Sequence, residues 1–294
     1  DNLEKVAEYK RNLSASKAGA CFITKEDAAL LPPGVVPAIT DDPELAFVKL
    51  EEYFSRDRAL EKRGISDRAD IDPSAKIGKG VHVGPFAVIE ADVVIGDGCY
   101  IGAGAKIKVG CGLGPGCIVR ENAVVGHAVL GAGVVIAEGA VIGNDGFGWH
   151  SSAAGHRWVP QIGRVILGDG VFVGANSTIA RGSQGDTVVG RGTKMDSLCL
   201  VSHNDRLGEN CIMAGMSGIA GSTVLGDWVL VGAQAGISGH LKIGDGVHIG
   251  AGGGVIQDLA PGAKVSGYPA QPIPDFLRQA AMLRTMVRKK KPQC

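Results

Sequence analysis

An apolar side chain recurs at every sixth position over most of this 294-residue chain. The longest run without a gap comprises Val189, Met195, Val201, Leu207, Met213, Ile219, Leu225, Val231, Ile237, Ile243, Ile249 and Val255. In all but two of these hexads the next residue is Gly, Ala or Ser; the exceptions are Asp196 and Ile256. A second run comprises Ile77, Val83, Ile89, Ile95, Ile101, Ile107, Leu113, Val119 and Val125.

A period of six suits neither an α-helix nor a two-layer sheet, but it suits a triangular coil of three short strands. Each apolar residue then points into a narrow prism, and the small residue after it lets the chain turn the corner. The sequence therefore predicts a mainly β fold, a parallel β-helix of hexapeptide repeats. Roughly ten coils at about 4.8 Å each give a prism on the order of 50 Å long.

The composition agrees with this fold and excludes several classes of protein. Glycine supplies 46 residues without a collagen triplet, as corners require, and aromatic residues are only 5%. Thirty basic residues balance thirty acidic ones, so the total charge does not predict nucleic-acid binding. No apolar run of about eighteen residues indicates a transmembrane helix. The chain does not begin with Met and shows no signal-peptide pattern, so we expect its first segment to be absent.

The cysteines and histidines do not predict a metal site. Five cysteines follow an apolar hexad residue by four positions, a slot that faces inward and takes small side chains: Cys99, Cys111, Cys117, Cys199 and Cys211. With no CxxC motif and an odd total, we expect buried free thiols in a reducing compartment. Only His150 and His156 lie even loosely at a ligand spacing, so no zinc site is expected.

Three domains are expected. Residues 1–66 lack the hexads and predict a small, incomplete α/β domain, with a helical segment at 3–13, strands at 20–23 and 35–39, and an amphipathic helix over 43–60. Residues 67–268 form the β-helix, which an insertion at 144–164 interrupts as a loop on one face. The register also slips by one residue near His127 and jumps over 181–187. Residues 269–294 predict a basic helix.

Outward polar residues that break the repeat are the candidates for chemistry, because a filled prism has no interior site. His203 lies two positions after an inward Val, and Asp196 occupies a slot that elsewhere holds a small residue. Gly221 lies one coil from His203, and His240 lies two coils plus one residue away, on nearly the same edge. An imidazole base, a carboxylate and an unobstructed backbone N–H suit acyl transfer. The alternatives are an exposed corner histidine and a turn-stabilising aspartate.

Four longer motifs carry a resemblance: GNDGFGWH, PQIGRVILGDGV, LVSHNDRLGENC and GISGHLKIGDGV. Within the hexapeptide acyltransferase superfamily, they resemble the UDP-3-O-(3-hydroxyacyl)glucosamine N-acyltransferases of lipid A synthesis in Gram-negative bacteria. The resemblance covers about residues 65–275, and the amino-terminal module more weakly. It implies a left-handed β-helix and a homotrimer with active sites in the clefts between prisms.

The resemblance also implies substrates and roles. The donor would be a 3-hydroxyacyl group on the phosphopantetheine arm of acyl carrier protein, so no separate cofactor is expected. The acceptor would be the C2 amine of UDP-3-O-acyl-glucosamine, and the protein would lie in the cytoplasm or peripheral to the inner membrane.

The resemblance also assigns roles to single residues. His203 matches the general base, His240 a second active-site histidine, Asp196 the partner of the base, and Gly221 the oxyanion donor. Asn2 and Tyr9 match nucleotide contacts, although extra residues separate them and the aromatic expected upstream is missing. Asn204 is a further predicted substrate contact.

Two segments admit both a functional and a structural interpretation. The helix after residue 269 carries Arg284, Arg288, Lys289 and Lys290, which either end a solvated helix or receive the acidic carrier protein. The run from Gly250 to Gly254 either makes a tight turn or leaves open the floor of an acyl groove.

Rival functions differ in what they require of the sequence. The related UDP-N-acetylglucosamine O-acyltransferases lack the large amino-terminal module and the DGFG…PQIGR loop. The sequence contains no loop that would support an acetyl-coenzyme A-dependent hexapeptide acetyltransferase. An inert β-helical scaffold would not place His and Asp against the repeat rule, and a γ-class carbonic anhydrase needs three zinc histidines.

Overall fold

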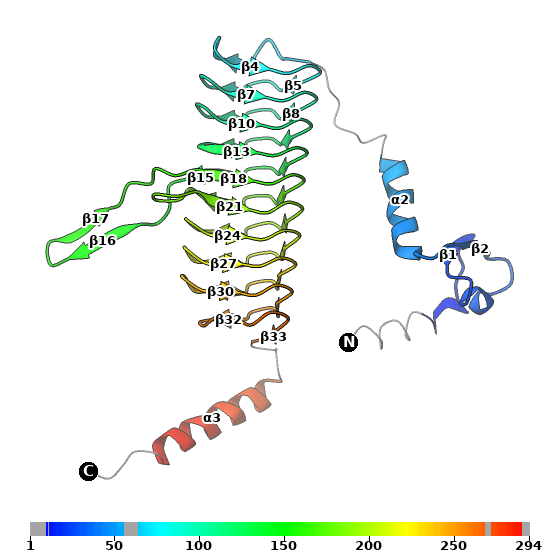
Figure 1. Cartoon of the computed structure of the whole chain (residues 1–294). Helices are drawn as coiled ribbons and strands as arrows, with labels where there is room; N and C mark the ends of the chain where they lie inside the picture. Colours follow the sequence, from blue (N-terminus) through cyan, green and yellow to red (C-terminus); the bar gives the residue numbers. More distant parts are fainter. Residues whose placement is uncertain (1–9, 11, 56–63, 268–271, 290–294) are drawn as a thin grey trace. The chain divides into compact units, whose positions relative to one another are not determined.

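The computed structural model describes residue 10 and residues 12–55, 64–267 and 272–289 (Figure 1). The chain divides into two compact units, residues 1–61 and 62–294. The boundary lies close to the end expected for the amino-terminal domain, and each unit is described by itself below.

The first unit is a small α/β arrangement. Strand β1 (Ala20–Ile23) pairs in parallel with β2 (Val36–Ile39), and the short helix η1 (Ala28–Leu30) lies between them in the chain. Helix α2 (Pro43–Ser55) follows, and the Asp42 carboxylate caps its first turn by accepting the Leu45 N–H at 2.9 Å. Both expected strands and the expected helix are present; the helix was expected to reach residue 60, but residues 56–63 lie outside the described part. Most of the segment 3–13 lies outside it too.

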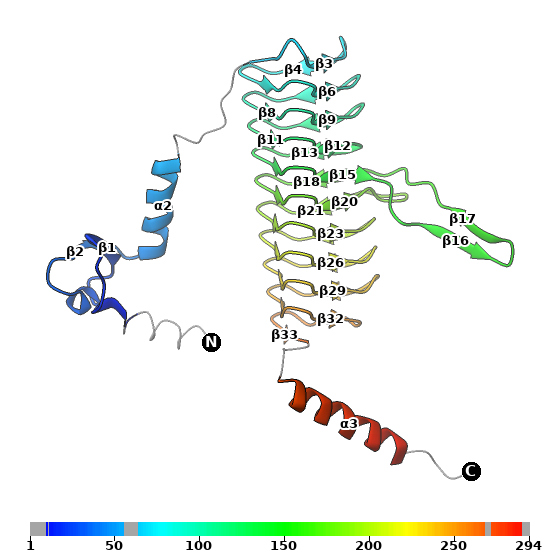
Figure 2. The ribbon, with the colours of Figure 1, turned by 180° about the vertical axis from the view of Figure 1, so that it is seen from behind.

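The second unit is the predicted β-helix. Three parallel sheets form its faces, and successive strands of one face come from successive coils (Figures 1 and 2). The first face contains β4 (Lys76–Ile77), β7 (Val94–Ile95), β10 (Gly112–Leu113), β13 (Ala128–Leu130), β18 (Val165–Leu167), β21 (Thr187–Val189), β24 (Arg206–Leu207), β27 (Val224–Leu225) and β30 (Lys242–Ile243).

The second face contains β5 (His82–Val83), β8 (Tyr100–Ile101), β11 (Ile118–Val119), β14 (Val135–Ile136), β19 (Phe172–Val173), β22 (Lys194–Met195), β25 (Ile212–Met213), β28 (Leu230–Val231), β31 (His248–Ile249) and β33 (Lys264–Val265). The third face contains β3 (Asp70–Ile71), β6 (Val88–Ile89), β9 (Lys106–Ile107), β12 (Val124–Val125), β15 (Val141–Asn144), β20 (Thr178–Ala180), β23 (Leu200–Val201), β26 (Gly218–Ile219), β29 (Gly236–Ile237) and β32 (Gly254–Val255). Faces of nine, ten and ten strands agree with the predicted number of coils.

The core of the prism is the column of hexad side chains. Val201 pairs with Ile219, Ile219 with Ile237 and Ile237 with Val255, so residues one coil apart stack in register. These inward residues are buried, and so are the five cysteines of the small inward slot, all of them free thiols. Burial of one aliphatic side chain per strand, at about 25 cal/mol per Å² of apolar surface, stabilises the stack, although each strand is too short to persist alone.

The interruptions of the repeat leave the prism as expected. After β15 the chain forms an antiparallel hairpin of β16 (Trp149–Ser152) and β17 (Gly155–Trp158), then rejoins the first face at β18 (Figures 1 and 2). Leu113 pairs with Leu130, seventeen positions away, which confirms the one-residue slip near His127. Residues 181–186 form the second, smaller insertion between β20 and β21, and Thr187, which was predicted to belong to it, is the first residue of β21.

Beyond the last coil, helix α3 (Ile273–Lys289) occupies the predicted basic segment. Among the described residues, no helix is both long enough and apolar enough to span a membrane.

Candidate active site

The edge at which the third face passes into the first face carries three of the candidate residues. Here this edge is called the His203 edge, and it comprises the corners after β23, β26 and β29. The Ser222 N–H donates to the His203 carbonyl at 3.0 Å, and the His240 N–H donates to the Gly221 carbonyl at 3.1 Å. His203, Gly221 and His240 therefore lie on three successive coils of one edge, as the spacing predicted.

The imidazole of His203 lies against Gly221. A Cβ added to Gly221 would be 2.7 Å from Cε1 and 2.8 Å from Nε2 of His203, so a side chain at 221 would displace the ring. Among the described residues, the Gly221 N–H donates to no protein acceptor. A half-exposed imidazole beside a free backbone N–H meets the geometric requirement for a base next to an oxyanion donor.

The side chain of Asn204 contacts His203 and the 181–186 insertion. Its Oδ1 lies 3.1 Å from Nδ1 of His203 and accepts hydrogen bonds from the N–H and the hydroxyl of Ser183, both at 3.0 Å. Its Nδ2 donates to the Gly185 carbonyl at 3.3 Å. The segment between β15 and β16 also lies against His203, because a Cβ on Gly146 would be 2.5 Å from the His203 Cβ.

Asp196 lies on a different edge, where the second face passes into the third. Its Oδ1 accepts the N–H of Ser197 at 2.7 Å, and a Cβ on Gly215 would be 3.1 Å from its Oδ2. Within one chain the structure therefore does not bring Asp196 to His203. Exposed apolar side chains surround it on this edge, with Leu198 and Met216 each 55% exposed.

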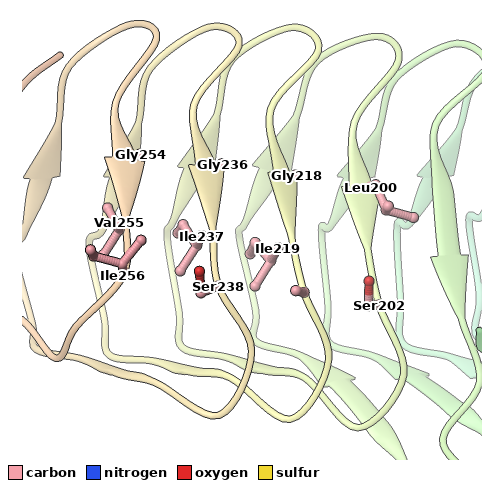
Figure 3. Close-up of a pocket in the computed structure, with 11 residues that line it drawn as sticks. Leu200, Ser202, Gly218, Ile219, Gly236, Ile237, Ser238, Gly254, Val255 and Ile256 are labelled. Carbon is pink, nitrogen blue, oxygen red and sulfur yellow. The ribbon is translucent and has the colours of Figure 1, made fainter. Parts of the chain in front are cut away.

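An apolar groove of about 490 Å³ runs along the third face beside the His203 edge (Figure 3). Gly218, Gly236 and Gly254 follow one another at the outward position of successive strands, and Leu200 occupies the same position one coil before Gly218. Ile256 also lines the groove, two positions after Gly254 in the last of these coils. A Cβ on Gly236 or Gly254 would meet nothing within 4 Å, so the missing side chains open this groove.

Only one residue of the 250–254 glycine run lines the groove. Gly254 lies in it, whereas a Cβ on Gly250 would be 2.7 Å from Oγ of Ser266, and Gly252 turns a corner with a φ of 66°. Within this run, Gly254 therefore lines the apolar groove, whereas Gly250 and Gly252 shape the turn. Gly236 and Gly218 were not predicted as groove residues; their signal is a glycine at the outward position one and two coils before Gly254.

Asp205 is a second residue that the sequence analysis missed. Its carboxyl is fully buried and accepts the N–H of Ser202 and the N–H of Thr223, both at 2.9 Å. Burial raises the pKa of this carboxyl to about 8, against the two backbone donors, which lower it. The signal was an acidic residue in the inward slot that elsewhere holds cysteine or another small residue.

Comparison with known proteins decides the family. The chain is 47% identical to a UDP-3-O-acylglucosamine N-acyltransferase from Granulibacter bethesdensis over 281 residues, which are 96% of this chain and 82% of that protein. It is 44% identical to the enzyme of the same name from Caulobacter vibrioides, over 95% of this chain and 81% of that protein. The chain belongs to the family of UDP-3-O-acylglucosamine N-acyltransferases.

Two further comparisons agree with the hexapeptide-repeat β-helix fold. The family model "Bacterial transferase hexapeptide (six repeats)" matches residues 74–108. The structure of an Arabidopsis UDP-N-acetylglucosamine acyltransferase superposes with a TM-score of 0.56 at 25% identity, covering 74% of this chain and 76% of that one. The much higher identity to the N-acyltransferases separates this chain from the UDP-N-acetylglucosamine acyltransferases, its rivals in the sequence analysis.

Most of the remaining predicted site residues, or their side chains, lie outside the described part of the chain. Asn2, Tyr9 and Lys290 lie outside the described residues. Arg284 is exposed on α3, whereas Arg288 and Lys289 belong to α3 with side chains outside the described part. Among the described residues, no group of three or more His, Cys, Asp or Glu side chains is placed to hold a metal ion.

Proposed function

We propose that this protein transfers a 3-hydroxyacyl group from acyl carrier protein to the C2 amine of UDP-3-O-(3-hydroxyacyl)glucosamine, giving UDP-2,3-diacylglucosamine. The observation that carries the proposal is the His203 imidazole beside the free Gly221 N–H, next to an apolar groove. Family membership supplies the acceptor, and the groove suits the aliphatic part of the donor.

The reaction follows from this arrangement. Nε2 of His203 takes a proton from the C2 amine as its nitrogen attacks the thioester carbonyl carbon. The carbonyl oxygen becomes an oxyanion, which the Gly221 N–H stabilises. The C–S bond then breaks, and the imidazolium gives its proton to the departing sulfur. The products are an amide and the free thiol of the carrier arm, with His203 neutral again.

In this proposal the apolar groove binds the long acyl chain of the donor. With the thioester at His203 and Gly221, the chain extends past Gly236 towards Gly254, over two further coils of about 4.8 Å each. Each buried methylene contributes about 0.8 kcal/mol to binding, so the open outward positions favour long donors.

A homotrimer gives Asp196 its proposed role. Asp196 and His203 belong to the same coil, seven residues apart, so a three-fold axis parallel to the prism keeps them at one height. In such an assembly Asp196 of one copy lies near His203 of the next, where its charge stabilises the imidazolium while Nδ1 keeps its contact with Asn204. The exposed Leu198 and Met216 beside Asp196 become covered.

The remaining parts bind the substrates in this proposal. The amino-terminal domain holds the nucleotide, with Asn2 and Tyr9 as its contacts, and His240 lies one coil beyond Gly221 to assist in binding or catalysis. The basic end of α3 receives the acidic carrier protein. These substrates place the reaction in the cytoplasm, with peripheral association of the enzyme at the inner membrane.

Subunit mixing tests the base and the shared site together. His203→Ala alone should lower kcat by about 10²–10⁴-fold without loss of stability, because the side chain is outside the core. Trimers co-assembled from His203→Ala and Asp196→Ala chains should regain activity in about one quarter of their sites, those that combine two intact residues from different copies. A His203→Ala enzyme with more than about a tenth of wild-type kcat contradicts the base assignment. Absence of recovery in mixed trimers contradicts the role of Asp196 across the interface.

A further inference from the structure

We infer that Asn204, held by the 181–186 insertion, is the positioning residue that fixes the proton of neutral His203 on Nδ1. Nε2, which faces Gly221, is then left to accept the proton of the substrate. The inference rests on the proposed role of His203 as the base. Asn204 was expected to contact the substrate; in this inference it instead orients the imidazole of His203.

The surroundings of Asn204 determine which way its amide points. The Ser183 N–H can only donate, so the atom 3.0 Å from it must be the amide oxygen. The Gly185 carbonyl can only accept, so the atom 3.3 Å from it must be the amide nitrogen. Neither contact involves the histidine, and together they place Oδ1 at 3.1 Å from Nδ1 of His203. Because a carbonyl oxygen only accepts, Nδ1 must carry the proton.

The insertion is itself held in place by the root of the hairpin. The Ile162 N–H donates to the Ser183 carbonyl at 2.8 Å, and the Gly163 N–H donates to the Gly182 carbonyl at 2.9 Å. Directly after the insertion, the buried hydroxyl of Thr187 accepts the N–H of Asn204 at 2.8 Å. The two segments that break the hexad rule are therefore bonded to each other and, through Asn204, to the base.

Close packing also makes the 181–186 insertion rigid. A Cβ on Gly163 or on Gly182 would collide with the Gly185 carbonyl, so the chain fits only with glycine at both positions. The Arg181 side chain, 13% exposed, donates from Nε to the Gly163 carbonyl at 2.8 Å. These hydrogen bonds and close contacts fix the 181–186 insertion, and they therefore keep the Oδ1 of Asn204 in one position while substrates bind and leave.

The neutral amide has a specific chemical consequence. An acceptor on Nδ1 orients the ring and selects the tautomer, as the carboxylate does in a serine protease triad. A carboxylate in the same place would also favour the imidazolium, whereas a neutral amide orients the ring without adding a negative charge.

The test compares Asn204→Ala, Asn204→Asp and Ser183→Ala with Asn210→Ala as the matched control. Asn210 occupies a corner with a φ of 54° on another edge, close to the 63° of Asn204, so it controls for losing asparagine at a corner. Asn204→Ala should lower kcat about tenfold or more with both KM values within about twofold of wild type. Ser183→Ala should have a smaller effect in the same direction, and Asn210→Ala should leave kcat unchanged.

The pH profile separates positioning from simple structural support. Asn204→Asp should shift the acidic limb of kcat/KM to higher pH by about one unit and restore most of the turnover at alkaline pH. In ¹⁵N-histidine spectra of the intact trimer, the neutral His203 of the wild type should be protonated at Nδ1, and Asn204→Ala should mix the two tautomers. An unshifted limb in Asn204→Asp, or wild-type His203 protonated at Nε2, overturns the inference.

Failure of the inference can be told from failure of the proposed function. If His203→Ala keeps wild-type turnover, the proposed function is wrong whatever Asn204 does. If His203→Ala is inactive while every Asn204 variant has wild-type kcat and pH profile, only the positioning role is wrong. If Asn204→Ala raises KM without lowering kcat, Asn204 contacts the substrate and does not position His203.

Discussion

At the scale of single residues, Asp205 makes the stability of the chain depend on pH. Its buried carboxyl lies two positions from His203 and has a pKa raised to about 8 by burial. Between about pH 4 and pH 8 the folded chain therefore holds a proton that the unfolded chain has released. Rising pH favours unfolding through this window by up to about 1.4 kcal/mol per pH unit, and the loss is complete above the folded pKa.

Asp205→Asn should remove this pH dependence. Its thermal midpoint, measured relative to that of the wild type, should rise steadily from pH 5 to pH 8, because only the wild type must ionise a buried group. Asp227→Asn is the control, since Asp227 is an exposed corner carboxyl that accepts the Glu209 N–H at 2.7 Å. A difference between wild type and Asp205→Asn that stays constant with pH would show that the buried carboxyl does not titrate in this range.

At the scale of elements, the row of outward glycines sets the length of the groove. Gly254→Met should favour donors shorter by a few methylenes, with kcat/KM for the longest chain falling most. Gly236→Met lies one coil nearer His203 and should shorten the preferred chain further, by the ~4.8 Å of one coil, or about four methylenes. The comparison uses a series of 3-hydroxyacyl carrier proteins of increasing chain length.

The control for this series is Gly112→Met. Gly112 also occupies an outward strand position, but it belongs to β10 on the first face, away from the groove. Its chain-length profile should match the wild type. Unchanged profiles in correctly folded Gly254→Met and Gly236→Met variants would remove the groove from the acyl site.

Helix α3 provides a second prediction at this scale. Reversing the charge of Arg284 and Arg288 together to Glu should raise KM for acyl carrier protein about tenfold and weaken the dependence of KM on ionic strength. Activity with a small pantetheine thioester should barely change. Arg278→Glu is the control on the same helix, because Arg278 lies 3.5 Å from Asp275 near its first turn. Equal losses with both donors would mean that the helix has a structural role only.

The elements also show what a sequence can predict and where it stops. The hexad pattern predicted the strands because burial in the prism depends on single positions, and it predicted the buried cysteines for the same reason. Stacking one coil apart likewise brought His203 and Gly221 together from spacing alone. The contacts of Asn204 could not be predicted, because they depend on how 181–186 folds back between the hairpin root and the corner. No repeat governs that path.

At the scale of the whole molecule, Asp196 shows why one chain is an incomplete description. The family resemblance made it the partner of the base, but the structure places it on another edge, among exposed apolar side chains. The proposed trimer explains both observations, since a neighbouring prism covers that edge and supplies its own His203. A pattern within one sequence cannot contain the geometry between copies.

The most direct measurement offers the purified protein 3-hydroxyacyl carrier protein with either UDP-3-O-acyl-glucosamine or UDP-N-acetylglucosamine, and identifies the products by mass and by resistance to mild base. We predict an amide-linked product, stable to base, with the first acceptor only, at a rate that His203→Ala abolishes. Acylation of UDP-N-acetylglucosamine as a base-labile ester, without reaction of the amine, would contradict the account.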